Sequence, residues 1–174
     1  MNDASPTIGE NTLVSGRSDV PQFVGFLIAG QHYLFRIEKI QEIIMPAAVA
    51  GVPEVPSYVE GVSNLRGTII PIINLRSLFG LDHREADVET RTIVVNVGSR
   101  TLGCTVDAVS RVMRIPPDQI QPAAEAAATT ARFVEGFAHV DEDLLILLDV
   151  EQLLDPARLD EVHRASIRMP PTTT

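Results

Sequence analysis

Residues 59–79 read Val-Glu-Gly-Val-Ser-Asn-Leu-Arg-Gly-Thr-Ile-Ile-Pro-Ile-Ile-Asn-Leu-Arg-Ser-Leu-Phe, so a polar turn stands directly before a very apolar strand. The turn residues Asn64 to Arg66 lie between Gly61 and Gly67, and glycine permits backbone angles that are closed to other residues. This placement holds Arg66 on a tight loop at the mouth of a strand. A single arginine on a loop is more often a solvated charge than a binding residue. The residues of this stretch alone therefore leave both interpretations of Arg66 open.

The composition is that of an ordinary soluble globular protein. The chain has 174 residues, of which 45% are hydrophobic and 21% charged, enough for one domain or two small subdomains with a buried core. No apolar run approaches the roughly 18 residues of a membrane-spanning helix, and the polar, acidic start of the chain is unlike a signal peptide. We therefore expect a cytoplasmic protein with no direct membrane insertion.

The charge and the cysteine count exclude several kinds of site. The formal net charge of −9 argues against non-specific binding to nucleic acid, which requires a basic face. Cys104 is the only cysteine, which excludes an internal disulfide and a cysteine-based metal site. Because it lies in an apolar stretch, we expect it to be a small buried residue of the core.

Short strands joined by turns dominate the first part of the chain. Residues 1–21 have no sustained hydrophobic period and predict a flexible tail. Residues 23–28 and 33–37 are β-rich runs on either side of a short glycine-containing connection, which predicts a β-hairpin. Residues 38–41 predict a helical turn that leads into a strand ending before Pro46.

Further elements follow the opening stretch. Residues 68–73 predict a strand, and Pro71 within it indicates an edge position or a bulge. Residues 75–79 predict a short helix that Gly80 ends. A long loop is expected over residues 116–132 and a surface helix near the C-terminus.

The sequence repeats itself after a charged connection at residues 82–91. A shift of 69 positions aligns residues 23–40 with 92–109, and a shift of 75 positions aligns residues 59–75 with 134–150. Two β-rich segments can look alike by chance, but the collinear order and the short helix after each apolar strand favour a duplication. Each half offers about five short strands, the number of a small closed barrel.

No group of residues has the spacing of an enzyme site or a metal site. The histidines are scattered and the common cofactor motifs are missing, so we expect no cofactor and no metal. Glu38, Asp107 and Asp149 could in principle perform acid–base chemistry, but their equivalent places in two repeats favour a role as caps or turn acceptors. The acidic run at residues 141–143 favours a solvated hairpin turn. The residues thus predict a non-enzymatic binding protein built from two β-modules.

The block from Gly61 to Gly67, the Ile-Ile-Pro-Ile-Ile that follows and Leu75-Arg76 closely resemble the signature of the CheW family, the coupling proteins of bacterial chemotaxis. The likeness extends over residues 22–156. It implies a mainly β fold with two five-stranded SH3-like β-barrel subdomains, at about 22–81 and 91–156, with a hydrophobic groove between them. Short helices and a C-terminal helix and tail at residues 157–174 complete the expected fold.

The resemblance also implies a function and a set of partners. CheW proteins link the cytoplasmic signalling tip of chemoreceptors, the methyl-accepting chemotaxis proteins, to the CheW-like regulatory domain of the CheA histidine kinase, and are recruited to receptor arrays. The apolar members of the site would line a groove for a receptor helix, while Glu42 and Arg66 would fix its register. The implied receptor-binding residues are Ile40, Glu42, Gly61, Asn64, Arg66, Val109 and Val112. The resemblance assigns no individual residue to the kinase interface.

One residue departs from the family pattern. Asn74 stands where the family usually has Asp, and a neutral amide can preserve the turn hydrogen bonds, so we expect the fold to survive. Two other functions stay open from the sequence: a CheW-like adaptor of a twitching-motility or second-messenger pathway and, more remotely, a carboxylate-dependent enzyme.

Overall fold

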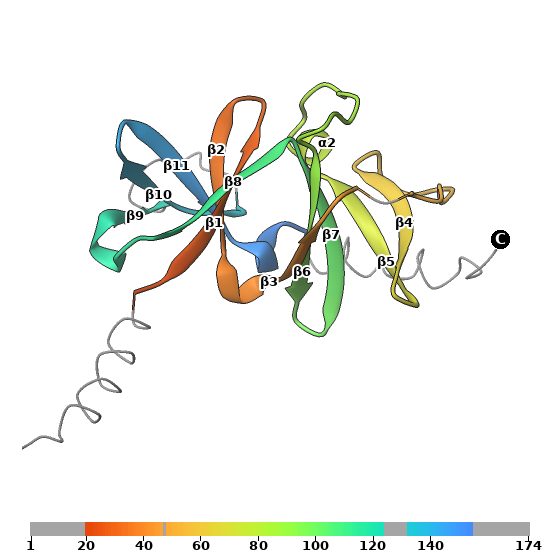
Figure 1. Cartoon of the computed structure of the whole chain (residues 1–174), viewed down its shortest axis with the longest axis horizontal. Coiled ribbons are helices and arrows are strands. Elements are labelled where there is room, and N and C mark those ends of the chain that lie inside the picture. The colour runs from red at the N-terminus through yellow and green to blue at the C-terminus, as the bar shows by residue number, and fades with distance from the viewer. Residues whose placement is uncertain (1–19, 47, 124–131, 155–174) are drawn as a thin grey trace, which may run out of the picture.

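The computed structural model describes residues 20–46, 48–123 and 132–154. Nearly all of the predicted N-terminal tail and all of the predicted C-terminal helix at 157–174 lie outside these ranges. The described chain forms two β-sheets that lie side by side (Figure 1). The strand order is β8-β1-β2-β11-β10-β9 in one sheet, here the β1 sheet, and β3-β6-β7-β5-β4 in the other, the β6 sheet. The predicted mainly β fold is confirmed, with one strand more than expected in the β1 sheet.

The elements are short and most strands are joined by tight turns. The strands are β1 (Gln22–Ile28), β2 (Gln31–Arg36), β3 (Ile40–Ile44), β4 (Val59–Leu65), β5 (Thr68–Asn74), β6 (Arg91–Val97), β7 (Arg100–Val106), β8 (Ala108–Arg114), β9 (Ile120–Pro122), β10 (Val134–Val140) and β11 (Asp143–Leu148). The helical turns are η1 (Ile37–Lys39), α2 (Leu75–Leu78), η2 (Pro117–Gln119) and η3 (Val150–Gln152). No helix in the described ranges is long and apolar enough to cross a membrane.

The duplication is confirmed by the register of the strands. In the β1 sheet Phe26 pairs with Val109, and in the β6 sheet the equivalent Val95 pairs with Ile40; an irregularity of register follows each pair at the same place. The β4–β5 and β10–β11 hairpins also share their register and their irregularity. Since pairing partners and bulges both repeat, the two halves have one architecture.

The two halves exchange their first hairpins. The β1–β2 hairpin joins strands of the second half, through a parallel pairing of β2 with β11, and the β6–β7 hairpin joins strands of the first half, through a parallel pairing of β7 with β5. The sheets therefore cross the predicted boundary between 22–81 and 91–156, which corrects the expectation that each half folds on itself. The alternation of apolar residues specifies the face of a strand, but it does not specify the strand's partner.

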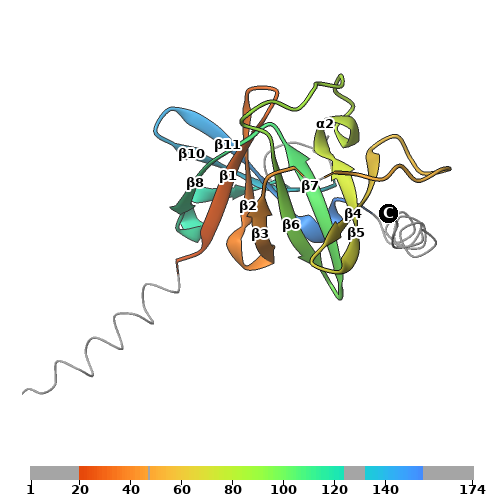
Figure 2. The ribbon, with the colours of Figure 1, turned by 45° about the vertical axis from the view of Figure 1, so that its right-hand side comes forward.

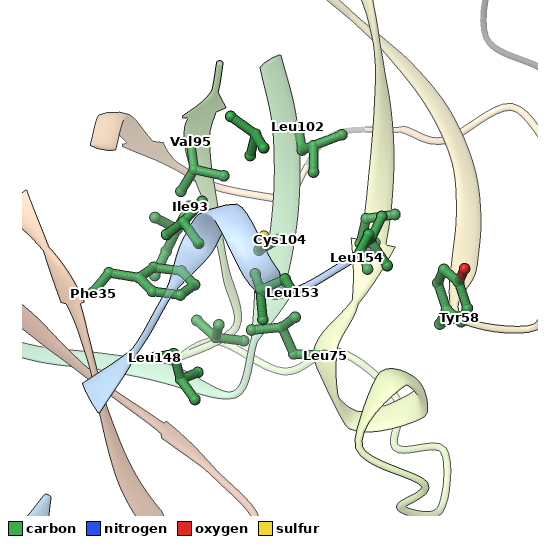
Figure 3. Close-up of a cluster of buried hydrophobic side chains, with 14 of the residues drawn as sticks. Phe35, Tyr58, Leu75, Ile93, Val95, Leu102, Cys104, Leu148, Leu153 and Leu154 are labelled. Atoms are coloured by element: carbon green, nitrogen blue, oxygen red, sulfur yellow. The ribbon is translucent and has the colours of Figure 1, made fainter. Parts of the chain in front are cut away.

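The largest core lies between the two sheets and receives side chains from both. Figure 3 shows Phe35 and Leu148 of the β1 sheet gathered with Ile93 and Cys104 of the β6 sheet. Leu75 of α2 and the residues that follow η3 cover the same core. All four strand residues named here are at most 1% exposed, so the two sheets share one hydrophobic interior. The expectation that Cys104 is buried in the core is confirmed.

Most of the local predictions are confirmed, and two need correction. The opening hairpin, the helical turn before β3, the turn at residues 141–142 and the short helix before Gly80 are all present. The edge position predicted from Pro71 holds for the residue but not for the strand, because β5 as a whole lies between β7 and β4. The β5 strand can hold the proline there because β7 pairs only with residues 72–74. The loop expected at 116–132 begins instead with η2 and the edge strand β9.

Candidate functional site

The β4–β5 hairpin closes with a turn of only two residues, Arg66 and Gly67. Both have positive φ angles, 51° and 89°, so the turn twists with the flanking strands as a two-residue hairpin turn requires. The side-chain oxygen of Asn64 accepts a hydrogen bond of 2.7 Å from the Gly67 N–H. The loop expected from Gly61 onward is therefore strand as far as Leu65, and Arg66 is held in a conformation that few non-glycine residues adopt.

Arg66 forms an ion pair with Glu42 on the edge strand β3. The Arg66 side chain is 66% exposed, whereas the Glu42 side chain is 23% exposed. Strand β3 and the end of β4 lie close together because Ile44 of β3 and Leu65 of β4 pack on the same small core of the β6 sheet. An exposed ion pair contributes no more than about 1 kcal/mol to stability. Its main effect is to fix the direction of the Arg66 guanidinium.

Gly61 supports the site through its backbone and offers no side chain for recognition. Its φ is 148°, and a Cβ at this position would lie 2.1 Å from the carbonyl oxygen of Ala50. That close approach allows Ala50 to pair with Val62 through hydrogen bonds of 2.8 and 2.9 Å. The glycine is thus required for the segment before β4 to lie against the strand.

The predicted apolar residues divide between the two sheets. Ile40 on β3 and Val109 on β8 are half-buried and pack against the core that the sheets share. Val112 is 54% exposed on β8, and Ile43, its equivalent on β3, is 39% exposed. The structure thus brings Glu42, Gly61, Asn64 and Arg66 together around one hairpin. Val109 and Val112 lie on the edge strand of the other sheet.

A second ion pair occupies the equivalent place in the other half. Asp141 has a φ of 59° in the β10–β11 turn, and its carboxylate lies 3.6 Å from the guanidinium of Arg111 on β8. The two shifts of the duplication carry Glu42 to Arg111 and Arg66 to Asp141, so the pair recurs with reversed polarity. Sequence reasoning missed this pair. The signal was present, because applying both shifts to Glu42 and Arg66 identifies it.

Asp107 is held in a clamp of hydrogen bonds. Its carboxylate accepts from the Arg76 guanidinium at 2.9, 3.0 and 3.2 Å and from the Ala29 N–H at 2.8 Å, and Arg84 lies 3.3 Å away. Burial acts to raise the pKa of Asp107, but the hydrogen bonds from Arg76 and Ala29 outweigh it and hold the pKa below its usual value. The carboxylate is therefore a structural acceptor, as predicted.

The remaining predicted polar residues cap helical turns or lie within them. Asp149 accepts a hydrogen bond of 2.9 Å from the Glu151 N–H at the start of η3, which confirms its predicted role as a cap. Asn74 caps α2 by accepting from the Ser77 N–H at 3.1 Å, so the amide does preserve the turn. Its amide nitrogen donates to Glu60 at 2.6 Å. Glu38 lies in η1.

The described residues contain no group of three or more His, Cys, Asp or Glu side chains that could hold a metal ion. Burial raises the pKa of the Cys104 thiol to about 12, so the thiol stays protonated at neutral pH. Within these ranges the site offers a charged hairpin and exposed apolar residues, an arrangement suited to contact with another protein.

Comparison with known proteins yields consistent matches. A model of the CheW-like domain family matches residues 22–158. The chain is 38% identical to the chemotaxis protein CheW of Klebsiella aerogenes over 156 residues, 87% of this chain and 94% of the relative. It is 35% identical to the chemotaxis protein CheW of Helicobacter pylori, over 78% of this chain and 82% of that one. The crystal structure of the scaffolding protein TtCheW from Thermoanaerobacter tengcongensis has a TM-score of 0.73 and 31% identity, covering 80% of this chain and 95% of that chain.

Proposed function

The chain belongs to the CheW family, and we propose that it is a non-enzymatic adaptor that couples chemoreceptors to a CheA-type histidine kinase. The observation that carries this proposal is Arg66, held on a two-residue turn within the family signature and directed by Glu42. Such a charge is fixed before a partner arrives, so binding does not have to order it. The named relatives are chemotaxis proteins, which favours chemotaxis over the other chemosensory pathways.

The receptor-binding surface in this proposal is centred on the β4–β5 turn and β3. Arg66 supplies an exposed cation and Asn64 stabilises the turn that presents it. Half-buried Ile40 and Val109 and exposed Val112 supply apolar contacts for a receptor helix, and Gly61 keeps the backbone of the hairpin in place. An adaptor of this kind works in the cytoplasm and is recruited to receptor arrays.

The carboxylates that an enzyme would need serve other contacts. Asp107 is bound by two arginines, and Asp149 caps η3. Neither is paired with the other, so they do not form an acid–base pair on one substrate. This arrangement supports a scaffold rather than a catalyst.

The proposal is tested by reconstituting receptors in membranes with the kinase and this chain. We expect kinase autophosphorylation to come under receptor control only when all three components are present. Arg66→Ala should weaken receptor binding about tenfold, as expected for the loss of one charge-assisted contact. Asp141→Ala, at the equivalent of Arg66 in the other half, is the matched control and should bind normally. If the wild-type chain binds neither partner, the proposed function is wrong.

A further inference from the structure

The interior of the β1 sheet is filled by three side chains from its first hairpin. Phe23 and Leu34 are 0% exposed and belong to a compact cluster of this sheet. The guanidinium of Arg36 lies 5.5 Å from the centre of the Phe23 ring and forms an ion pair with Glu135 on β10. An aromatic ring, a branched alkyl group and a cation thus occupy this side of the β1 sheet together.

The β6 sheet lacks all three groups at the equivalent positions. The shift of 69 positions carries Phe23 to Thr92, Leu34 to Gly103 and Arg36 to Thr105. The register of the strands is the same in both sheets, so these residues face the equivalent interior. A Cβ on Gly103 would point at the tip of Ile72, 2.7 Å away, and at the Thr92 methyl, 3.0 Å away. The β6 sheet (Figure 2) therefore has no aromatic ring and no cation at these positions, while the Ile72 and Thr92 side chains take part of the space that Leu34 takes in the β1 sheet.

A cavity of about 250 Å³ is lined by two of these three positions, Thr92 and Thr105. Its apolar lining includes Ile44, Leu65, Ile70 and Ile72. Its polar lining includes Glu60 and Asn74 as well as Arg76, Arg84 and Asp107, which pair with one another. The mixture of an apolar wall with a few polar groups at one side is typical of a small-molecule site.

Glu60 is the carboxylate at this cavity that no cation of the described residues neutralises. It is the equivalent of Glu135, which pairs with Arg36. Glu60 accepts hydrogen bonds from the neutral groups of Asn74 at 2.6 Å and Thr105 at 3.4 Å. The nearby arginines are engaged elsewhere, because Arg76 and Arg84 both bind Asp107.

We propose that this cavity binds a small organic cation that carries an aromatic or branched apolar group. The cationic nitrogen pairs with Glu60 as Arg36 pairs with Glu135. The apolar group takes the space beside Thr92, the equivalent of Phe23, and lies against Ile70 and Ile72. An anion of the same shape is rejected, since it would face the Glu60 carboxylate. The cavity shares Ile44 and Leu65 with the small core beneath the Arg66–Glu42 pair, but its test does not require a receptor or a kinase.

The test uses phenethylamine as the probe, with phenylacetate as its anionic counterpart. Titration of the full chain, followed by calorimetry and by the methyl NMR signals of Ile70, Ile72 and Thr92, should show saturable binding of phenethylamine. Phenylacetate should bind at least about tenfold more weakly. The proposal is overturned by the absence of saturable binding at about 10 mM phenethylamine, by equal binding of phenylacetate, or by shifts confined to other parts of the chain.

Three variants that alter the cavity sharpen the test. Glu60→Gln should weaken phenethylamine binding about tenfold or more, because it removes the charge that selects a cation. Thr105→Arg places a guanidinium at the position equivalent to Arg36, where it can pair with Glu60. This variant should abolish phenethylamine binding and raise the midpoint of thermal unfolding. Gly103→Leu displaces the tip of Ile72, which lines the cavity, and should also abolish binding.

The matched control is Glu135→Gln, the same change in the filled sheet, which should leave phenethylamine binding within about twofold. Each variant is first checked for cooperative thermal unfolding. If Gly103→Leu does not fold, Thr105→Arg, which alters only the polar side of the cavity, decides the question. A folded Thr105→Arg or Glu60→Gln protein that binds phenethylamine as tightly as the wild type would contradict the proposal.

Discussion

The turns of two equivalent hairpins, β4–β5 and β10–β11, share a positive φ at their first residue and differ in charge. Arg66 and Asp141 occupy the same turn position with positive φ, and each pairs with a residue on an edge strand, Glu42 or Arg111. The ion pair is therefore a property of the repeated scaffold. What is particular to the first half is the polarity of the pair, with the cation on the turn. A partner that recognises this hairpin can distinguish it from the other by charge alone.

A second pair of positions also differs in charge between the halves. Arg76 of α2 binds Asp107, whereas its equivalent, Glu151 of η3, binds Lys39 at 3.0 Å. Lys39 is the residue after Glu38, the equivalent of Asp107, so only the Arg76 position changes sign. The two ion pairs also differ in burial. The side chains of Arg76 and Asp107 are 16% and 14% exposed, against 36% and 37% for Lys39 and Glu151. We therefore expect the Arg76–Asp107 ion pair to contribute more to stability than the Lys39–Glu151 ion pair.

The largest effect on stability should come from the interior of the filled sheet. Leu34→Ala removes a fully buried side chain and should lower the free energy of unfolding by about 3 kcal/mol. Gly103→Ala, at the equivalent position, should change it by less than about 1 kcal/mol, because the Ile72 tip can move into the cavity. Urea unfolding of both variants measures the contrast. Equal losses would show that the two interiors are filled alike.

The two bulge glycines should give the next largest contrast. Gly61→Ala places a Cβ against the Ala50 carbonyl oxygen at a positive φ, and should cost about 2 kcal/mol. Gly136→Ala meets the Gln121 oxygen at 2.7 Å on the edge strand β9, and should cost about 1 kcal/mol. Urea unfolding tests this order. A larger loss of stability for Gly136→Ala would mean that the segment before β4 moves away from the added methyl group more easily than β9 does.

The buried charges provide a smaller contrast and a dependence on pH. Asp107→Ala leaves Arg76 without its partner and should cost about 1.5 kcal/mol at pH 7, whereas Glu151→Ala should cost less than about 0.5 kcal/mol. The pKa of Asp107 is depressed in the folded protein, so its contribution is present above the unfolded pKa of about 4 and is lost as pH falls through the folded value.

Urea unfolding between pH 7 and pH 3 measures this loss. The wild type should lose more stability over the acid range than Asp107→Ala, which has no carboxyl to protonate at this position. Parallel curves for the two proteins would show that Asp107 does not contribute to acid sensitivity.

Much of this architecture was predictable, because local patterns determine it. The β-rich runs, the glycine turns and the duplication identified most of the strands and the repeat itself. The exchange of the first hairpins was not predictable, because the sequence pattern of a strand does not identify the strand beside it. Strand β9 was missed because a prolyl residue in a run of three gives no strand signal.

The receptor-binding residues stay a prediction. The structure gathers four of the residues that the family resemblance implies, Glu42, Gly61, Asn64 and Arg66, around one hairpin. The cavity of the β6 sheet was missed, since it lies beside Thr92 and Thr105, which are small where the equivalent Phe23 and Arg36 are large. This difference in side-chain size can be interpreted only once the strand register shows that the equivalent positions face the interior of each sheet in the same way.

The smallest effect on stability should come from reversing the two exposed ion pairs. The double variant Glu42→Arg/Arg66→Glu keeps an ion pair and gives the first hairpin the polarity of the second, and Arg111→Asp/Asp141→Arg does the converse. Each should change the free energy of unfolding by less than about 0.5 kcal/mol, as measured by urea unfolding, because exposed pairs contribute little. A larger loss would show that polarity matters to the fold itself.

Receptor-controlled kinase activity of these two double variants, measured in the reconstituted receptor–kinase system, tests the central claim most directly. We expect Glu42→Arg/Arg66→Glu to lose receptor control of the kinase, and Arg111→Asp/Asp141→Arg to retain it. Both proteins are folded and both hairpins keep an ion pair, so the difference would come from polarity at one surface. Normal receptor control by Glu42→Arg/Arg66→Glu would contradict the assignment of this hairpin as the receptor-binding surface.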